Sequence, residues 1–219
     1  MTERILVTAG NTWAPLDKVR VLTNIFSGET GLRIAHSLAR SGFKVTLILA
    51  DIRVNPKPYR HKRLKIIRAL TYKAFYKAVK KEVKRKIYRA VVHAAAVSDF
   101  YLKKPLTGKI SSRKNLKLTL SRTSKIVNRI KKWDPKIILI KFKLEAGKKK
   151  RQLLKIALKS KKQSKANLII ANQIPTKRTH TFYVIKSSRQ HLKITGKKAL
   201  ASKLTKIFKK ELSDDYTRD

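Results

Sequence analysis

Residues 4–49 read RILVTAGNTWAPLDKVRVLTNIFSGETGLRIAHSLARSGFKVTLIL, and this stretch decides the fold. Residues 5–8 are a continuous apolar run typical of a buried strand, and residues 32–41 carry apolar side chains at helical spacing. Gly42 stands where a helix C-cap is expected, and residues 44–49 predict a second strand. A strand, a helix and a strand in this order indicate a β–α–β unit with parallel strands.

The same alternation continues along the rest of the chain. Further strands are predicted at residues 64–67, 116–120, 136–140, 168–171 and 181–185, of which 116–120 alternates and is expected to be exposed. Residues 89–97 predict a strand that runs into a turn of small residues. Helices are predicted at residues 72–85, 124–132, 148–164 and 199–212. This pattern predicts an α/β fold with a doubly wound, Rossmann-like and mostly parallel sheet, with a flap and a strand extension. No boundary divides the sequence, so residues 1–219 are expected to form a single domain.

The charge of the chain is unusual, with 56 Lys and Arg residues against 12 Asp and Glu residues and a formal net charge of +44. Such an excess favours nucleic acid as a partner, because each neutralised phosphate releases counterions. The basic residues are spread from Lys57 to Lys210, however, and not concentrated in a tail or a known motif. A basic nucleic-acid-binding protein therefore stays an alternative, and non-specific binding of RNA to a lysine-rich surface is the simpler expectation.

Several classes of protein are disfavoured by what the sequence lacks. It has no cysteine, which excludes disulfides, thiolate metal sites and a cysteine nucleophile. The five histidines show no metal-ligand spacing and no pattern of a hydrolytic triad. No apolar run approaches the roughly 20 residues of a membrane span, and the N-terminal residues predict a strand, not a signal peptide. A cytoplasmic protein with no membrane partner is expected.

The loop between the first strand and the first helix is far longer than the two to six residues usual in α/β units, and long loops are commonly functional. Ligands of open parallel sheets bind beyond the carboxyl ends of the strands. Gly28 and Gly31 precede the helix there, so backbone N–H groups could hold phosphate. The spacing fits neither GxGxxG nor GxxxxGK[ST], which also argues against an NAD(P) oxidoreductase.

Four polar residues in such positions allow more than one interpretation. Arg20 could bind a carboxylate or phosphate in a bidentate manner, or be one surface arginine among many. Asn24 could orient a carboxylate or cap a turn. Asp99 could hold Mg²⁺ or cap a turn, and Lys109 follows Gly108 in a loop of a chain rich in lysine.

Taken together, these segments resemble the phosphopantothenoylcysteine synthetases, also called phosphopantothenate–cysteine ligases. The resemblance runs in the right order from residue 5 to about residue 185, and several motifs in register are a strong signal. The motifs in this sequence are Val7-Thr-Ala-Gly-Asn-Thr12, Pro15-Leu-Asp17, Val19-Arg20, Asn24, Ser27-Gly28, Gly31, Ala95-Ala-Val-Ser-Asp-Phe100, Lys109-Ile110, Lys125-Ile126, Phe142-Lys-Leu-Glu145 and Ala171-Asn172.

The resemblance implies a reaction of coenzyme A biosynthesis. A ligase would join 4′-phosphopantothenate to L-cysteine through an acyl-nucleotide formed from ATP or CTP, with Mg²⁺ and release of pyrophosphate. It also implies a homodimer, in which Arg20 comes from the neighbouring subunit. The residues implied are Lys109 and Asn24 for catalysis; Arg20, Asn24, Ala95, Ala96 and Asp99 for phosphopantothenate; Gly10, Ser27, Gly28, Gly31, Phe142 and Asn172 for the nucleotide; and Asp99 for the metal.

Two details are closer to the eukaryotic type of this family, namely Ala96-Val-Ser-Asp-Phe-Tyr101 and Lys109-Ile-Ser-Ser112. That type favours ATP, whereas the common bacterial type favours CTP. The sequence carries no flavin-binding decarboxylase segment upstream, so a stand-alone ligase is expected. Four positions depart from the family pattern and concern the nucleotide pocket: Asn11, Phe26, Lys141 and Gln173.

Overall fold

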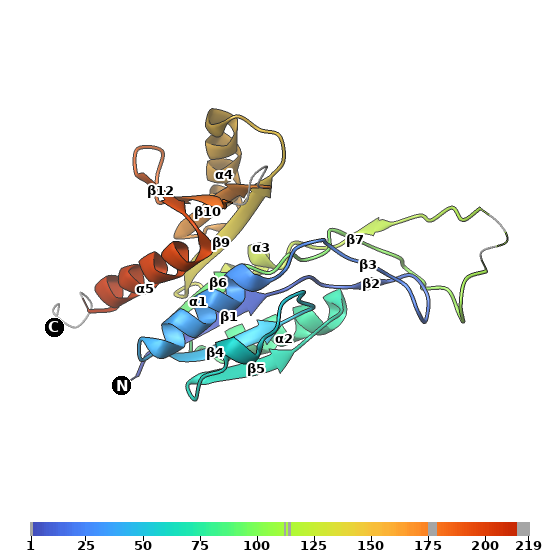
Figure 1. Ribbon diagram of the computed structural model, residues 1–219, viewed down its shortest axis with the longest axis horizontal. Coiled ribbons are helices and arrows are strands. Elements are labelled where there is room, and N and C mark those ends of the chain that lie inside the picture. The colour runs from blue at the N-terminus through green and yellow to red at the C-terminus, as the bar shows by residue number, and fades with distance from the viewer. Residues whose placement is uncertain (1, 112, 114, 175–178, 214–219) are drawn as a thin grey trace.

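The computed structural model describes residues 2–111, 113, 115–174 and 179–213, and its centre is a sheet of eight strands (Figure 1). The strands lie in the order β12-β11-β10-β9-β6-β1-β4-β5. Their bounds are β1 Arg4–Ala9, β4 Lys44–Leu49, β5 Leu64–Arg68, β6 Ala90–His93, β9 Ile138–Glu145, β10 Leu168–Gln173, β11 Thr181–Ile185 and β12 His191–Thr195.

The first six of these strands along the chain pair in parallel, whereas β11 and β12 are antiparallel. In sequence order the parallel strands lie as 3-2-1-4-5-6, which is the order of a doubly wound dinucleotide-binding sheet. The predicted α/β fold with a mostly parallel sheet is therefore confirmed.

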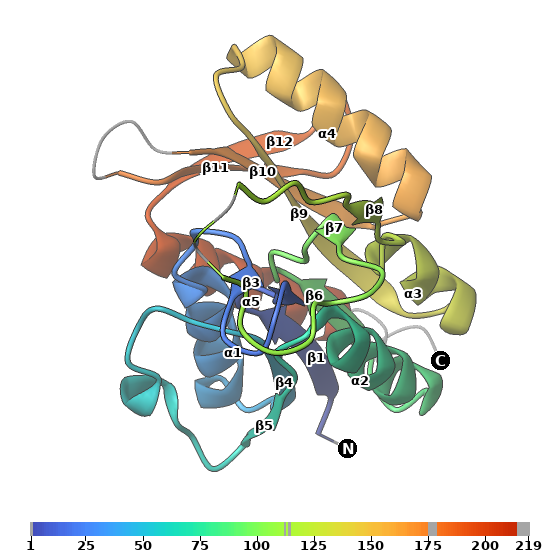
Figure 2. The ribbon, with the colours of Figure 1, turned by 90° about the vertical axis from the view of Figure 1, so that its right-hand side faces the viewer.

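The helices cover both faces of the sheet (Figures 1 and 2). On one face, α1 (Glu29–Arg40) and α5 (Lys197–Ser213) enclose an apolar cluster. On the other face, α2 (Tyr72–Lys84) and α3 (Val127–Trp133) enclose a second cluster, and α4 (Lys150–Ser164) encloses a third. A short 3-10 helix spans Lys57–Tyr59. None of the helices in the described residues has the length and apolar character required to cross a membrane.

Local sequence signals set the ends of these helices. Thr71 caps α2, because its side chain accepts a hydrogen bond from the Ala74 N–H at 3.3 Å. Gly42 follows the last turn of α1 with a φ of 104°, a conformation that favours glycine and lets the chain turn into β4.

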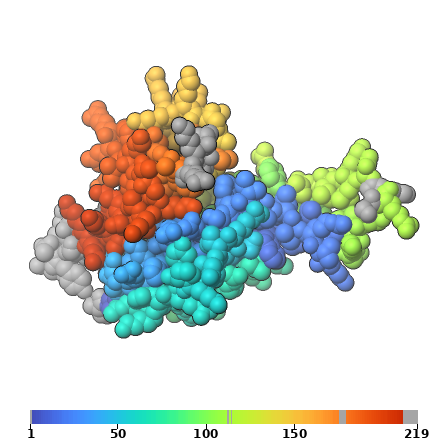
Figure 3. Space-filling model, viewed as in Figure 1, coloured from blue at the N-terminus to red at the C-terminus, as the bar shows by residue number. Residues whose placement is uncertain are grey.

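A long arm stands out from the body of the molecule (Figure 3). We define the arm as residues 14–25 and 100–122, of which 112 and 114 lie outside the described residues. It contains two short antiparallel pairs, β2 (Ala14–Pro15) with β3 (Val21–Leu22), and β7 (Phe100–Tyr101) with β8 (Ser121–Arg122). The Leu106 N–H donates to the Leu16 carbonyl oxygen at 2.9 Å, which joins the two segments.

Some predicted strands differ from those observed. The strand at residues 116–120 is wrong, because described residues 115–120 form no strand and pairing in this segment is limited to β8. In segment 89–97, predicted as a strand that runs into a turn, the strand ends at His93, because the following residues turn to pair with the loop after β1. In that turn the Ala96 N–H donates to the Gly10 carbonyl oxygen at 2.9 Å. Strand β12 was not predicted, since its side chains are mostly exposed.

Candidate active site

A buried row of polar side chains interrupts the apolar face that lies under α2, α3 and α4. Thr8, His93 and Lys141 stand side by side in register on β1, β6 and β9, and they are at most 8% exposed. Two residues earlier in each strand, on the same face of the sheet, the corresponding positions hold apolar core residues: Leu6, Val91 and Leu139. Because buried polar groups need partners, such a row in a core indicates a functional site.

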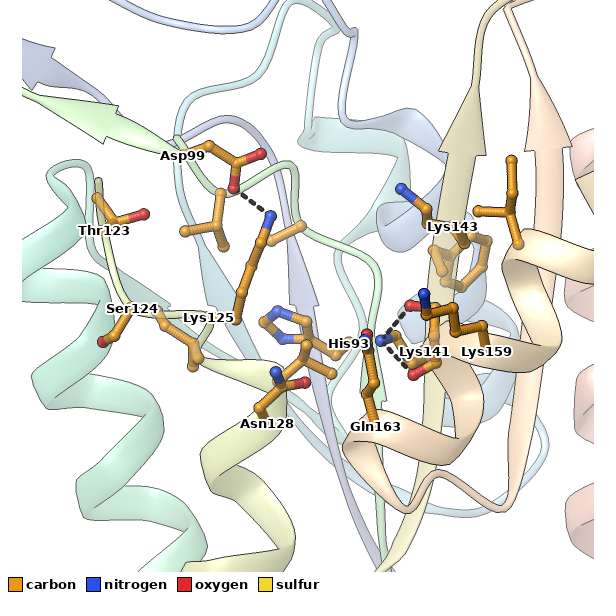
Figure 4. Close-up of a pocket in the computed structure, with 17 residues that line it drawn as sticks. His93, Asp99, Thr123, Ser124, Lys125, Asn128, Lys141, Lys143, Lys159 and Gln163 are labelled. Atoms are coloured by element: carbon orange, nitrogen blue, oxygen red, sulfur yellow. Dashed lines mark hydrogen bonds and ion pairs between the residues drawn. The ribbon is translucent and has the colours of Figure 1, made fainter. Parts of the chain in front are cut away.

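A cavity of about 340 Å³ lies beside this row, between the beginning of α3 and the inner side of α4 (Figure 4). This volume is at the lower end of the range for small-molecule sites. His93 and Lys141 form part of its wall, together with residues that follow β6 and with Phe142 and Lys143 on β9. Apolar contributions come from Ala95, Ile126 and Ile156. The cavity therefore lies near the carboxyl ends of two parallel strands, where this class of sheet binds ligands.

The His93 imidazole is held as a neutral group. Its Nδ1 atom lies 3.0 Å from Thr8 Oγ1, which also accepts a hydrogen bond from the Ala95 N–H at 3.3 Å. Burial lowers the pKa of His93 to about 4, and the positive charge of Lys141 acts in the same direction. At neutral pH His93 can therefore offer a hydrogen bond to a ligand without adding charge.

Lys141 places an ammonium group inside the protein. Its Nζ atom donates to Ser160 Oγ at 2.9 Å and to the Ser160 carbonyl oxygen at 3.2 Å (Figure 4). Burial and, to a smaller extent, the charges of Lys143 and Lys125 together lower the pKa of Lys141 to about 8. Lys141 therefore carries its charge at neutral pH in a region that disfavours charge.

More cations stand around the mouth of the cavity. The Lys125 ammonium is paired with the Asp99 carboxylate, and both side chains are more than half exposed (Figure 4). Lys143 is paired with Glu145 at 2.7 Å. Lys159 on α4 is exposed and also lines the cavity. The surroundings of the cavity are thus positively charged, which suits an anionic ligand.

The loop after β1 and the first turn of α1 are packed too closely to hold larger residues at Gly10 and Gly31. Gly10 has a φ of +85°, and a Cβ atom there would lie 2.5 Å from the Asp51 carbonyl oxygen. A Cβ atom on Gly31 would lie 2.5 Å from the Cβ of Ala9. Asn11 is buried, and its amide donates to the carbonyl oxygens of Phe26 and Asp51. Two of the departures from the family pattern, Asn11 and Phe26, therefore contact each other.

The structure brings several of the predicted site residues together. The Asn24 amide donates to the Ala96 carbonyl oxygen at 3.1 Å, which connects the long loop with the segment after β6. Ala95, Asp99 and Phe142 line the cavity. Ser27 and Gly28 lie at the beginning of α1, where the Glu29 N–H contacts Ser27 Oγ at 3.4 Å.

Nine of the twelve predicted site residues are not in the wall of the cavity. Six of these nine belong to the loop after β1, the beginning of α1 or the segment after β6, namely Gly10, Asn24, Ser27, Gly28, Gly31 and Ala96. The other three are Arg20, Lys109 and Asn172. Arg20 lies in the arm, where it contacts the Asp17 carboxylate at 2.8 Å, and Lys109 is exposed in the same arm. Asn172 lies on β10, where it pairs with Leu144 and Phe182. The register places it on the same face of the sheet as Phe142, toward α1 and α5.

His93 and Ser160 were not singled out as site residues from the sequence, and Lys141 was noted only as a departure from the family pattern. The sequence does carry a signal for His93 and for Lys141. His93 ends an otherwise apolar strand, and Lys141 interrupts the apolar run of β9. Ser160 gave no such signal, because serine is common on the faces of helices.

A doubly wound sheet with a cationic cavity beside the carboxyl ends of its strands defines an α/β protein suited to anionic small molecules. Residues 1–216 match the family described as DNA/pantothenate metabolism flavoprotein, C-terminal domain, and the chain belongs to this family. The resemblance inferred from the motifs is therefore confirmed.

Curated relatives point the same way. The chain is 34% identical over 212 residues to the coenzyme A biosynthesis bifunctional protein CoaBC of Thermococcus kodakarensis. The matched residues cover 97% of this chain and 49% of that protein. The chain is 30% identical over 173 residues to the CoaBC protein of Methanocaldococcus jannaschii, covering 78% of this chain and 40% of that protein. The chain thus spans half or less of the length of these relatives.

Solved structures share the fold. The DNA/pantothenate metabolism flavoprotein from Streptococcus pneumoniae superposes with a TM-score of 0.85 at 29% identity, over 96% of this chain and 100% of that chain. A Cab2 variant in complex with phosphopantothenate-cysteine superposes with a TM-score of 0.79 over 98% of this chain and 89% of that chain. Its identity of 17% supports the fold only.

Proposed function

We propose that the chain is a phosphopantothenate–cysteine ligase of coenzyme A biosynthesis. The observation that carries this proposal is the convergence of Asn24, Ala96 and Asp99 with Phe142 and Lys125 around one end of the sheet. These residues come from separate motifs of a family to which the chain belongs. We also propose that the whole chain is one domain in this role and that it acts in the cytoplasm, which agrees with the absence of cysteine.

The reaction we propose has two steps. A carboxylate oxygen of phosphopantothenate attacks the α-phosphorus of the nucleoside triphosphate, and pyrophosphate leaves with the electrons of the broken P–O bond. The cysteine amine then attacks the acyl carbon, loses a proton and expels the nucleoside monophosphate. No protein nucleophile is required, so the task of the protein is to bring anions together and to stabilise developing charge.

Each predicted residue has a part in this proposal. Asn24 and the Ala95-Ala96 backbone orient the phosphopantothenate carboxylate, and Arg20 of a second subunit contacts its phosphate. Lys109 stabilises the charge that develops at the α-phosphate. Backbone N–H groups near Gly10, Ser27, Gly28 and Gly31 face the phosphate chain, and Phe142 and Asn172 adjoin the nucleoside.

A magnesium ion would be carried mainly by the nucleotide. Within the described residues no three His, Cys, Asp or Glu side chains cluster as a metal site. Mg²⁺ commonly takes one or two protein carboxylates together with substrate phosphates and water, so Asp99 fits as a single protein ligand. When bound, the ion neutralises phosphate charge. Asp99 would then exchange its partner Lys125 for the ion.

We propose that the protein is a homodimer formed through the arm. Of the thirteen described large apolar residues that are exposed, nine lie in the arm: Val19, Val21, Leu22, Ile25, Phe100, Leu106, Leu116, Leu118 and Leu120. Such a concentration of apolar surface favours association. A second copy would also explain how Arg20 and Lys109, which lie away from the cavity of their own chain, reach a site.

The nucleotide is proposed to be ATP, on the basis of the motifs closer to the eukaryotic type. The test is to incubate the protein with phosphopantothenate, cysteine, Mg²⁺ and either ATP or CTP, and to follow pyrophosphate and product by mass spectrometry. Product with ATP supports the whole proposal, and product only with CTP corrects the nucleotide. No product with either nucleotide refutes the ligase activity.

The net charge of +44 favours nucleic acid as a second candidate. Specific recognition would persist at moderate salt, whereas association through charge alone weakens by about 10³ or more between 50 and 200 mM salt. We expect the steep dependence, measured by fluorescence anisotropy with a labelled single-stranded RNA. Tight binding that survives 200 mM salt would favour the nucleic-acid function.

A further inference from the structure

Packing of the core does not explain why a lysine occupies position 141. Lys141 is 5% exposed and lies in the middle of β9. Within the described residues its side chain forms no ion pair. Its protein partners are two neutral oxygen atoms of Ser160. A charged amine in such surroundings costs stability, and costs of this kind are typical of functional groups.

Lys141 has a donor left for a ligand. An ammonium group has three N–H donors, and the two Ser160 oxygens occupy two of them. Because Lys141 lines the cavity, the remaining donor is available there. His93 lies next to it in register, with Nδ1 engaged by Thr8 and Nε2 left for another partner. In the tautomer in which the Thr8 hydroxyl donates to Nδ1, the Nε2–H group is a second donor beside the Lys141 ammonium group (Figure 4).

The cations of the cavity differ in depth. Lys125 has a side chain that is 58% exposed, and Lys159 is also exposed, so both can meet a hydrated phosphate chain. Lys141 is instead buried, in the wall of a cavity that Ile126 and Ile156 also line. A flat, weakly hydrated base loses less solvation than a phosphate when it enters such surroundings. The deep amine therefore suits the nucleoside, and the exposed amines suit the phosphates.

We propose that Lys141 is a nucleotide-binding residue that donates a hydrogen bond from its ammonium group to a ring nitrogen or carbonyl oxygen of the base. Ser160 holds the ammonium group in place, and His93 supplies a neighbouring donor. This inference rests on the proposed function, because it assumes that a nucleoside triphosphate occupies the cavity. It goes beyond the family motifs, since Lys141 departs from the family pattern.

The test compares Lys141→Met with Lys136→Met by isothermal titration calorimetry. Methionine keeps the length of the side chain and removes its charge. Lys136 precedes the same strand at its opposite end and is exposed, so its loss is the matched control for one positive charge. The probes are ATP and CTP, the nucleosides adenosine and cytidine in competition with them, and inorganic tripolyphosphate.

We expect Lys141→Met to weaken binding of the preferred triphosphate and its nucleoside by roughly ten-fold or more, the range for a hydrogen bond to a charged donor. Tripolyphosphate binding stays within two-fold of wild type, and Lys136→Met changes none of the probes by more than that. Equal nucleotide affinity in Lys141→Met and wild type overturns the inference. An equal loss for tripolyphosphate overturns the assignment to the base.

Two further results separate the inference from other failures. Ser160→Ala keeps Lys141 and removes the Ser160 hydroxyl, one of the two oxygen atoms that hold its ammonium group, so we expect a smaller loss of nucleoside affinity. Full nucleoside affinity in both Ser160→Ala and Lys141→Met overturns the role of Ser160 and Lys141. If the wild-type protein binds neither ATP nor CTP, the proposed function itself fails. Thermal melting confirms folding of Lys141→Met, which is expected to be at least as stable as wild type, since it removes a buried charge.

Discussion

The Ile110 N–H donates a hydrogen bond to the Asp17 carboxylate at 2.9 Å, and this bond joins the two segments of the arm beside Lys109. The other oxygen of Asp17 accepts from the Val19 and Arg20 N–H groups at 2.8 and 2.6 Å. The bond from Ile110 is the largest of the effects that lower the pKa of Asp17 to about 2. Burial alone would raise this pKa, and the bonds from Val19 and Arg20 lower it further. Asp17 is therefore ionised at neutral pH and fixes the base of the loop that carries Lys109.

Asp17→Asn should detach this loop. An amide at the position of Oδ2 would point N–H groups at the Ile110 N–H and at Arg20 Nη1, both of which are donors. We expect a fall in the rate of pyrophosphate release of about ten-fold or more, because a misplaced catalytic group loses much of its effect. Hydrogen exchange at the Ile110 amide should become faster. Unchanged exchange in the variant would contradict the role of Asp17.

Lys109→Gln tests the activation step. If Lys109 stabilises charge at the α-phosphate, its loss costs about 3 kcal/mol, or roughly 100-fold in pyrophosphate release. The melting temperature should stay the same, since Lys109 is exposed. Lys104→Gln, an exposed lysine in the same arm, is the matched control. Wild-type pyrophosphate release by Lys109→Gln would remove the residue from the mechanism.

The first β–α–β unit could be predicted from sequence because its signals are local. The apolar run of β1, the periodicity of α1 and the turn at Gly42 each lie within a few residues. The arm could not be predicted in the same way. Residues 116–120 alternate as a strand does, yet in the described residues they have no neighbouring strand with which to pair. Alternation indicates exposure on one side but does not supply a partner.

The candidate site also contains residues that could be predicted from the sequence and residues that could not. Residues that follow predicted strands, such as Asp99 and Phe142, were predicted to gather because parallel strands end at a common edge. The pair of His93 and Lys141 depends on the register between β6 and β9, which no local pattern encodes. Their contact with Ser160 depends in addition on how α4 lies across the sheet. Tertiary packing decides such contacts.

The arm provides a test of the dimer. Ile25 is 71% exposed, and Ile25→Lys should disfavour association by placing a charge in an apolar interface. We expect a monomer by light scattering and a large loss of ligase activity, because Arg20 and Lys109 would no longer reach the partner's cavity. Leu192→Lys is the control, since Leu192 is 44% exposed on β12, outside the arm. A monomeric wild-type protein with full activity would refute the dimer.

The buried His93 predicts how stability depends on pH. Its pKa is about 4 in the folded protein against an ordinary value of 6.5, so below pH 6.5 the unfolded chain binds a proton that the folded protein does not. The free energy of unfolding should therefore decrease by roughly 3 kcal/mol as the pH falls from 6.5 to 4. Urea denaturation at intervals of half a pH unit measures this slope.

The variant His93→Asn separates this effect from other titrating groups. Asparagine carries no titrating charge and retains a hydrogen-bond acceptor for Thr8. Burial also lowers the pKa of His180, so we expect the slope in the variant to flatten without vanishing. Asp17 acts at lower pH, because its carboxylate loses its contribution only as the pH falls from 3.8 to about 2. A slope between pH 6.5 and 4 that is identical in wild type and variant would show that His93 takes up its proton as readily in the folded protein as in the unfolded chain.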